Sequence, residues 1–144
     1  MRLTAKSEYG LLAMIYLASS LEDGPVSARE ISEQQEIPAK FLEQLFVGLR
    51  QAGLVSAVRG ARGGFALAHA PEDINVLAIV EALEGPLVAT VCEGDRGLTC
   101  GRSGACAAAA VWNRATAALR DVFESATLAE LVTAQDVIDS RPIG

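Results

Sequence analysis

The chain contains few of the residues from which catalytic and metal sites are usually built. Its 144 residues include one histidine and three cysteines. With one histidine there is no evident nucleophile–histidine arrangement, and the sequence has neither a glycine-rich phosphate loop nor paired carboxylates in a pocket motif. We therefore predict that the protein is not an enzyme and has no small-molecule substrate. The histidine, His69, is interpreted as a surface or packed imidazole.

Aromatic residues and long apolar runs are also scarce. Aromatic residues make up 5% of the chain, and the abundance of alanine and leucine favours helices over a β-sandwich. The apolar run in MRLTAKSEYGLLAMIYLASSLEDG is short, has Glu8 in its approach and is followed by no A-x-A cleavage site. It predicts an amphipathic helix in a cytoplasmic protein, with no signal peptide and no membrane span. The odd number of cysteines argues against a disulfide framework.

The net charge of −6 is unevenly distributed along the chain. Residues 1–70 hold seven Lys/Arg and seven Asp/Glu, whereas residues 71–144 hold five Lys/Arg and eleven Asp/Glu. A neutral half with clustered arginines can bind phosphates, while DNA would repel the acidic half. Net charge alone neither requires nor excludes DNA binding, and it predicts that the acidic half faces away from any DNA.

Capping residues and apolar periodicity predict three helices in the first third of the chain. The segments are 4–20, capped by Thr4; 28–35, opened by Ser27 and Glu30 as a capping box; and 38–52, with Pro38 in its first position. The second and third helices are joined by a short turn and each has one apolar face, which is the helix-turn-helix pattern.

A β-hairpin is predicted directly behind the third helix, with strands over 54–59 and 64–68. A helix-turn-helix followed by such a hairpin, or wing, is a winged helix. Arg59 and Arg62 lie at the tip of the hairpin, and Gly63 and Gly64 let the backbone approach another surface closely. A solvated Arg-Gly turn that binds nothing is the alternative for the turn taken alone.

Three further helices are predicted after the hairpin. They are 74–84, capped by Asp73; about twenty residues in AAAAVWNRATAALRDVFESA; and TLAELVTAQDVI, opened by Thr127 and Glu130 as a capping box. One side of the long helix is formed by recurring apolar residues, namely Val111, Ala115, Ala118, Leu119, Val122 and Phe123. Because it is longer than a small domain needs for its own core, it predicts a homodimer, with packing inside one chain as the alternative.

These elements predict a mostly α-helical fold with a small β-hairpin wing. It comprises a winged helix-turn-helix domain over 1–84, a cysteine loop over 85–105, and a long C-terminal dimerisation helix with a last helix over 106–144. The parts form one integrated architecture, since no linker or low-complexity segment separates them.

The three cysteines, Cys92, Cys100 and Cys106, all fall in the glycine-rich stretch VCEGDRGLTCGRSGAC. Thiolates gathered on a pliable loop can hold a metal or an iron–sulfur cluster, either [4Fe–4S] or [2Fe–2S]. Two other uses of the thiols stay open, a structural zinc site and a redox switch through disulfide or sulfenic chemistry. A cluster carrier that binds no DNA is a further alternative, which the arginine-tipped hairpin disfavours.

The assembled pattern resembles the Rrf2 family of bacterial winged-helix transcription regulators, especially its iron–sulfur members of the IscR, NsrR and RirA kinds. The matching stretches are MRLTAKSEYGLLAM, ISEQQEIPAKFLEQLFVGLRQAGLVSAVRGARGGFAL, the three cysteines and TLAELV, which together cover about residues 1–137. The resemblance implies a homodimer that binds palindromic promoter DNA, usually as a repressor, with a cluster that reports iron, redox or nitric oxide status.

The resemblance also implies which residues contact DNA. On the recognition helix they are Ala39, Lys40, Glu43 and Gln44. Glu43 can accept a hydrogen bond from cytosine and Gln44 can pair with adenine. The remaining contacts, to phosphates or grooves, would come from Lys40, Arg50, Arg59 and Arg62, with Gly63 and Gly64 in the hairpin.

The cysteine spacing departs from that of IscR-like members, which have C-x5-C-x5-C and a histidine three residues after the third cysteine. Here the spacing is C-x7-C-x5-C, and Ala109 stands in the place of that histidine. NsrR-like members use a carboxylate from the other subunit as the fourth ligand, and Glu8 matches its position. Such a weakly held ligand suits a sensor. The alternative for Glu8 is a solvated carboxylate favoured by the helix dipole.

Overall fold

Six α-helices and one β-hairpin form the part of the chain that the computed structural model describes, residues 3–87 and 106–142. The helices are α1 (Ala5–Ser19), α2 (Ala28–Gln35), α3 (Ala39–Gln51), α4 (Val76–Glu84), α5 (Ala107–Ser125) and α6 (Leu128–Asp139). Strands β1 (Val55–Val58) and β2 (Gly64–Leu67) pair antiparallel, and two 3-10 turns cover Leu21–Asp23 and Pro71–Asp73. The predicted fold class is confirmed.

Three of the predicted helix caps are confirmed. The side-chain oxygens of Thr4, Ser27 and Thr127 accept hydrogen bonds from backbone N–H groups in the first turns of α1, α2 and α6. The capping box at Ser27 is half formed, because the Glu30 carboxylate accepts from the Tyr16 hydroxyl at 2.8 Å. Burial, together with this bond to Glu30, raises the pKa of Tyr16.

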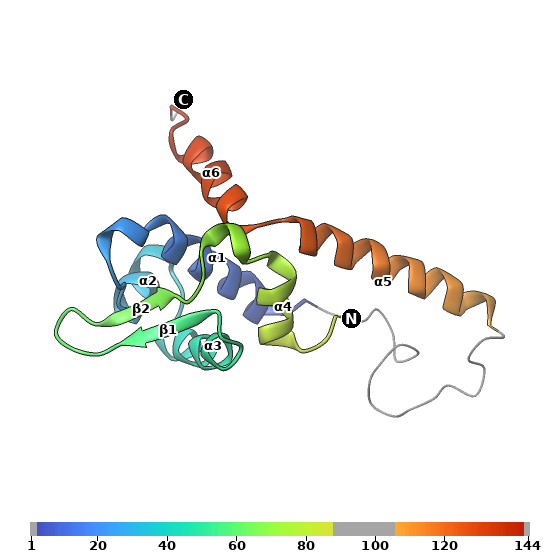
Figure 1. Cartoon of the computed structure of the whole chain (residues 1–144), viewed down its shortest axis with the longest axis horizontal. Coiled ribbons are helices and arrows are strands. Elements are labelled where there is room, and N and C mark those ends of the chain that lie inside the picture. Colours follow the sequence, from blue (N-terminus) through green and yellow to red (C-terminus); the bar gives the residue numbers. More distant parts are fainter. Residues whose placement is uncertain (1–2, 88–105, 143–144) are drawn as a thin grey trace.

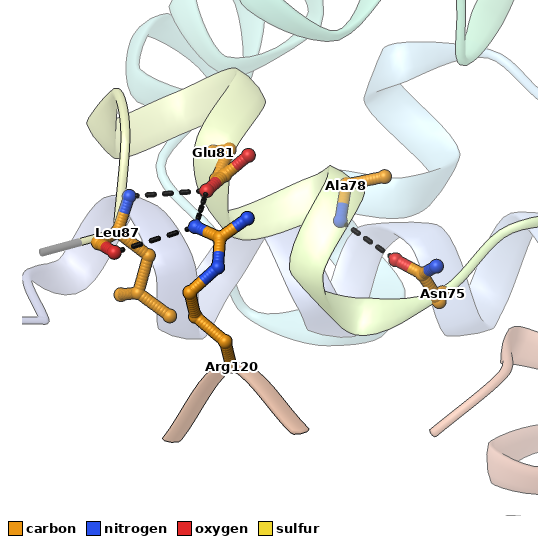
Figure 2. Close-up of polar contacts among 5 residues, drawn as sticks. All are labelled: Asn75, Ala78, Glu81, Leu87 and Arg120. Carbon is orange, nitrogen blue, oxygen red and sulfur yellow. Dashed lines mark hydrogen bonds and ion pairs between the residues drawn. The ribbon is translucent and has the colours of Figure 1, made fainter. Parts of the chain in front are cut away.

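Two of the predicted helix starts are wrong. Asp73 lies in the 3-10 turn, and the cap of α4 is Asn75, whose Oδ1 accepts from the Ala78 N–H at 2.9 Å (Figure 2). Asn75 has the extended backbone that a cap residue needs, with φ −103° and ψ 164°. Pro38 precedes α3 instead of occupying its first position, because its ψ of 129° is also extended.

The hairpin is held against α3 by aromatic packing. The rings of Phe46 in α3 and Phe65 in β2 stack in parallel, with centroids 4.0 Å apart and planes 8° apart. The backbone of Phe65 also pairs with Val26, just before α2, through N–H···O bonds of 2.7 and 2.9 Å. The hairpin therefore has a fixed orientation relative to both helices of the helix-turn-helix.

Helix α5 extends away from the winged domain (Figure 1). Its C-terminal half packs Leu119 and Phe123 against a small cluster with α4 and Leu87. Among the described residues nothing covers the rest of its predicted stripe, and the Val122 side chain is 62% exposed. Within a single chain, α4 therefore covers only one end of this side of the helix. No helix of the described ranges is long and apolar enough to span a membrane.

The C-terminal end of α4 is joined to the start of α1 by Glu84. Its carboxylate accepts hydrogen bonds from the Thr4 N–H at 3.1 Å, from the Thr4 hydroxyl, and from the Ser7 hydroxyl at 2.9 Å. Burial acts to raise the pKa of Glu84, but these hydrogen bonds together outweigh it and lower the pKa below its usual 4.5.

Glu84 is therefore expected to make the stability of the fold sensitive to acid. Its contribution is present above the ordinary glutamate pKa of 4.5 that the unfolded chain has, and it is lost as the pH falls through the lower folded-state pKa. Glu84→Gln should unfold more easily than wild type at pH 7 and approach wild type in acid. Urea denaturation of both proteins across this pH range measures the effect. Exposed Glu72→Gln is the control, and an equal response in both variants would contradict the assignment.

Candidate functional site

One side of α3 is buried and the other is open to solvent. The buried side consists of Leu42, Leu45, Phe46 and Leu49. The exposed side carries every residue that the sequence assigned to the recognition helix, namely Ala39, Lys40, Glu43, Gln44 and Arg50. The helix therefore presents one polar face with amide, carboxylate and cationic groups, the donors and acceptors that can read base edges in a major groove.

Three residues at this face were missed by the sequence analysis. Val47 is 54% exposed between the predicted polar residues, and Gln51 is exposed one turn further on. Helical spacing from Glu43 would have revealed both. Lys6 comes from α1 and lines the same groove of about 250 Å³ as Gln44 and Gln51. No local pattern could have placed Lys6 there, since the groove is formed by separate helices.

The turn of the hairpin carries two exposed arginines. Arg59 and Arg62 flank its tip, and β1 packs next to α3 (Figure 1). With Lys40 and Arg50 on α3 they give four exposed cations on two adjacent elements. An arrangement of this kind can bind two stretches of a phosphate backbone at once.

The two glycines after the turn have a structural reason of their own. A Cβ on Gly63 would lie 2.2 Å from the Val58 carbonyl oxygen, and one on Gly64 would lie 2.3 Å from the Val26 carbonyl oxygen. A larger residue at position 63 would therefore clash with the hairpin backbone, and one at position 64 would clash with the backbone of Val26. This crowding accounts for both glycines without any contact to a ligand.

Of the three cysteines, only Cys106 lies within the described residues. It is the N-terminal cap residue of α5, is half-buried, and has a free thiol. Cys92 and Cys100 lie outside the described residues. Within residues 3–87 and 106–142, no three His, Cys, Asp or Glu side chains are grouped as a metal site.

Glu8 lies in the first turn of α1, and its exposed carboxylate forms no hydrogen bond or ion pair within the described part of the chain. The structure does not bring it to Cys106. In Figure 1 the end of α5 that begins at residue 107 points away from the winged domain, whereas α1 lies inside it. Within one chain the two groups therefore come from separate parts of the molecule.

Comparison with known proteins establishes the family. A family model described as "Iron-dependent Transcriptional regulator" matches residues 3–134. This chain belongs to the Rrf2 family. Among Rrf2 relatives, the HTH-type transcriptional regulator IscR of Erwinia tasmaniensis is 39% identical over 138 residues, which span 96% of this chain and 82% of that protein.

Solved structures agree with the assignment to the Rrf2 family. T. potens IscR superposes with a TM-score of 0.75 at 34% identity, over 100% of this chain and 94% of that one. CymR, described as the global cysteine regulator of B. subtilis, superposes with a TM-score of 0.76 at 34% identity, over 93% of this chain and 98% of that one. These relatives are transcriptional regulators, which are not enzymes, so the predictions of the family and of a non-enzymatic role are confirmed.

Proposed function

We propose that this chain is a homodimeric, cytoplasmic transcription repressor that binds palindromic promoter DNA and senses iron, redox or nitric oxide status through an iron–sulfur cluster. The observation that carries the proposal is the exposed polar face of α3 beside the arginine-tipped hairpin, in a chain whose only cysteines precede α5 within fifteen residues. In this proposal residues 1–84 bind DNA, residues 85–105 with Cys106 hold the cluster, and residues 106–144 form the dimer.

The proposed DNA contacts divide into two kinds. Glu43 and Gln44, exposed on α3, read base edges in the major groove. Lys40, Arg50, Arg59 and Arg62, with the backbone at Gly63 and Gly64, position the domain on the phosphates or grooves. Helix α6, in the acidic half, lies on the opposite side of the molecule from α3 (Figure 1), so DNA bound at α3 would avoid its charge.

The proposed dimer is supported by the uncovered length of α5. A helix of 19 residues is about 28 Å long, and only its C-terminal half packs on α4. Three large apolar side chains on this helix are exposed: Val111, Trp112 and Val122. A second copy of the chain would cover such a surface, and a dimer would place two recognition helices at the two halves of a palindrome.

The residues present fit an iron–sulfur cluster. Three thiols supply the soft donors that such clusters prefer, and the described one, Cys106, is free and only half-buried. Because the Cys106 end of α5 projects from its own domain, a fourth ligand would come from a second subunit, and the exposed Glu8 carboxylate is its candidate. When bound, the cluster supplies a group that iron supply, oxidants or nitric oxide can alter.

The first experiment measures iron, acid-labile sulfide and molecular mass of protein purified without oxygen. We expect a dimer that contains both iron and sulfide. Cys106→Ser should lose both while it keeps the helix, because serine is a better N-cap than cysteine. Glu8→Ala should hold the cluster less firmly. The matched control is Glu130→Ala, which removes an exposed first-turn carboxylate from α6.

Other outcomes of the same measurement point to the alternatives. Zinc without sulfide would indicate a structural zinc site, and metal-free protein after anaerobic reconstitution would leave a thiol switch. A loaded protein that shows no salt-dependent binding to promoter DNA would be a cluster carrier. Each of these results would contradict the proposed sensor.

A further inference from the structure

The last turn of α4 contacts four other parts of the chain: Leu87, α5, α1 and α3. Its first residue, Glu81, accepts hydrogen bonds through one oxygen from the Leu87 N–H at 3.1 Å and from Arg120 Nη1 of α5 at 2.6 Å (Figure 2). The same Arg120 nitrogen also donates a hydrogen bond to the Leu87 carbonyl oxygen, at 3.4 Å. Both polar groups of the Leu87 backbone are therefore bound, one to α4 and one to α5.

Leu87 is the residue from which the chain continues into the cysteine stretch. Its side chain is 2% exposed and packs in the small cluster with α4 and α5, so that its position is fixed by packing as well as by hydrogen bonds. The ion pair between Glu81 and Arg120 is partly open to solvent, and an isolated pair of this kind adds little to stability. Its evident effect is to set the geometry of Leu87 relative to the two helices.

In the same turn, the Leu83 side chain packs against α1 and α3. A Cβ on Gly10 of α1 would lie 2.2 Å from Leu83 Cδ1, and one on Gly48 of α3 would lie 3.6 Å from Leu83 Cδ2. The Gly48 Cβ would also lie 3.3 Å from the Ala82 carbonyl oxygen. Leu83 thus fits against two helices at positions that carry no side chain, and Gly48 directly follows Val47 of the exposed face.

We infer that the last turn of α4, Glu81–Glu84, links the start of the cysteine stretch to the recognition helix, with Glu81 and Arg120 as the positioning residues. A shift of Leu87 moves Glu81, and the packing of Ala82 and Leu83 beside Gly48 carries the shift into α3, because a packed interior transmits displacement. Glu84 anchors the same turn to Thr4 and Ser7, beside Glu8. The inference rests on the proposed function, since the cluster is what would move Leu87.

Arg120→Gln tests this link through the ratio of DNA affinities of the cluster-loaded and cluster-free protein. The DNA affinities of the loaded and cluster-free wild type should differ by about 5- to 150-fold, the typical range for coupling between two sites. The two affinities of Arg120→Gln should differ by only about 1- to 3-fold. Fluorescence anisotropy on a labelled promoter fragment measures both states. Arg141→Gln, which removes an equal charge from an exposed residue two positions beyond α6, should keep the wild-type ratio.

A second readout needs no cluster. In cluster-free Glu81→Ala, hydrogen exchange of the Leu87 amide should quicken, because its acceptor is gone, and exchange in α3 around Gly48 should change with it. A faster Leu87 amide with α3 unchanged would overturn the inference, whichever state of the protein binds DNA.

The two proposals fail in different ways. A wild-type affinity ratio of one, or wild type that holds no cluster, would overturn the proposed function and this inference with it. A clear wild-type ratio that persists in fully loaded Arg120→Gln would overturn the inference alone.

Discussion

Replacement of Phe46 by alanine is expected to lower the free energy of unfolding by about 3–5 kcal/mol, the usual cost of removing a buried aromatic ring. Phe46 is 1% exposed and stacks on Phe65 at a centroid distance of 4.0 Å. Its loss would leave a cavity between α3 and the hairpin, which the surrounding backbone can fill only in part. Urea denaturation followed by circular dichroism measures the change.

The neighbouring residue on α3 supplies the control. Val47 is 54% exposed, so Val47→Ala should change the free energy of unfolding by no more than about 0.5 kcal/mol. Equal losses in the two variants would mean that α3 does not pack with Phe46 inward. The face assigned to DNA recognition would then be wrong as well, because the two faces are opposite sides of one helix.

The double variant Arg59→Ala/Arg62→Ala is expected to bind DNA at least about 100-fold more weakly at 0.1 M salt. A dimer would lose four phosphate contacts, two in each subunit, and this reduces the salt dependence of log K by about 3.6. Both arginines are exposed at the tip of the hairpin and outside the core, so the fold should be retained. Titration of promoter DNA at several salt concentrations gives the affinity and the slope together.

A comparison with Gln44→Ala separates the two kinds of contact. Loss of a base-reading amide should cost about 1–3 kcal/mol in each half of the promoter site and little on unrelated DNA. The double arginine variant should weaken binding to both DNAs alike. If the arginine variant kept the wild-type salt dependence, the hairpin would not contact phosphates.

Local sequence signals located most of the fold. Thr4, Ser27 and Thr127 cap helices as predicted, because a capping hydrogen bond joins a residue to N–H groups two or three positions away and needs nothing from the rest of the chain. The two sides of α3 were also predictable, since helical spacing alone separates Leu42, Leu45 and Phe46 from the polar residues.

The sequence failed where several residues compete for one role. Asp73 and Asn75 are both good caps, and only the 3-10 turn over Pro71–Asp73 decides for Asn75. Glu30 fits a capping box, yet its carboxylate bonds to Tyr16 from another helix. The partner of Glu30 lies on another helix, and no local pattern contains that information. The choice between Asp73 and Asn75 depends on the backbone of the preceding turn, which the residue types alone do not specify.

The sequence by itself determined the helices, the hairpin, the family and the grouping of the cysteines, because these depend on neighbours within a few residues or on stretches that match directly. Only the tertiary structure decided which part of α5 is covered, and which residues meet at the last turn of α4. Glu81, Leu87 and Arg120 form one hydrogen-bonded group there. Leu83 fits against Gly10 and Gly48 only because α1, α3 and α4 converge, and such close packing depends on three-dimensional shape that spacing along a chain does not encode.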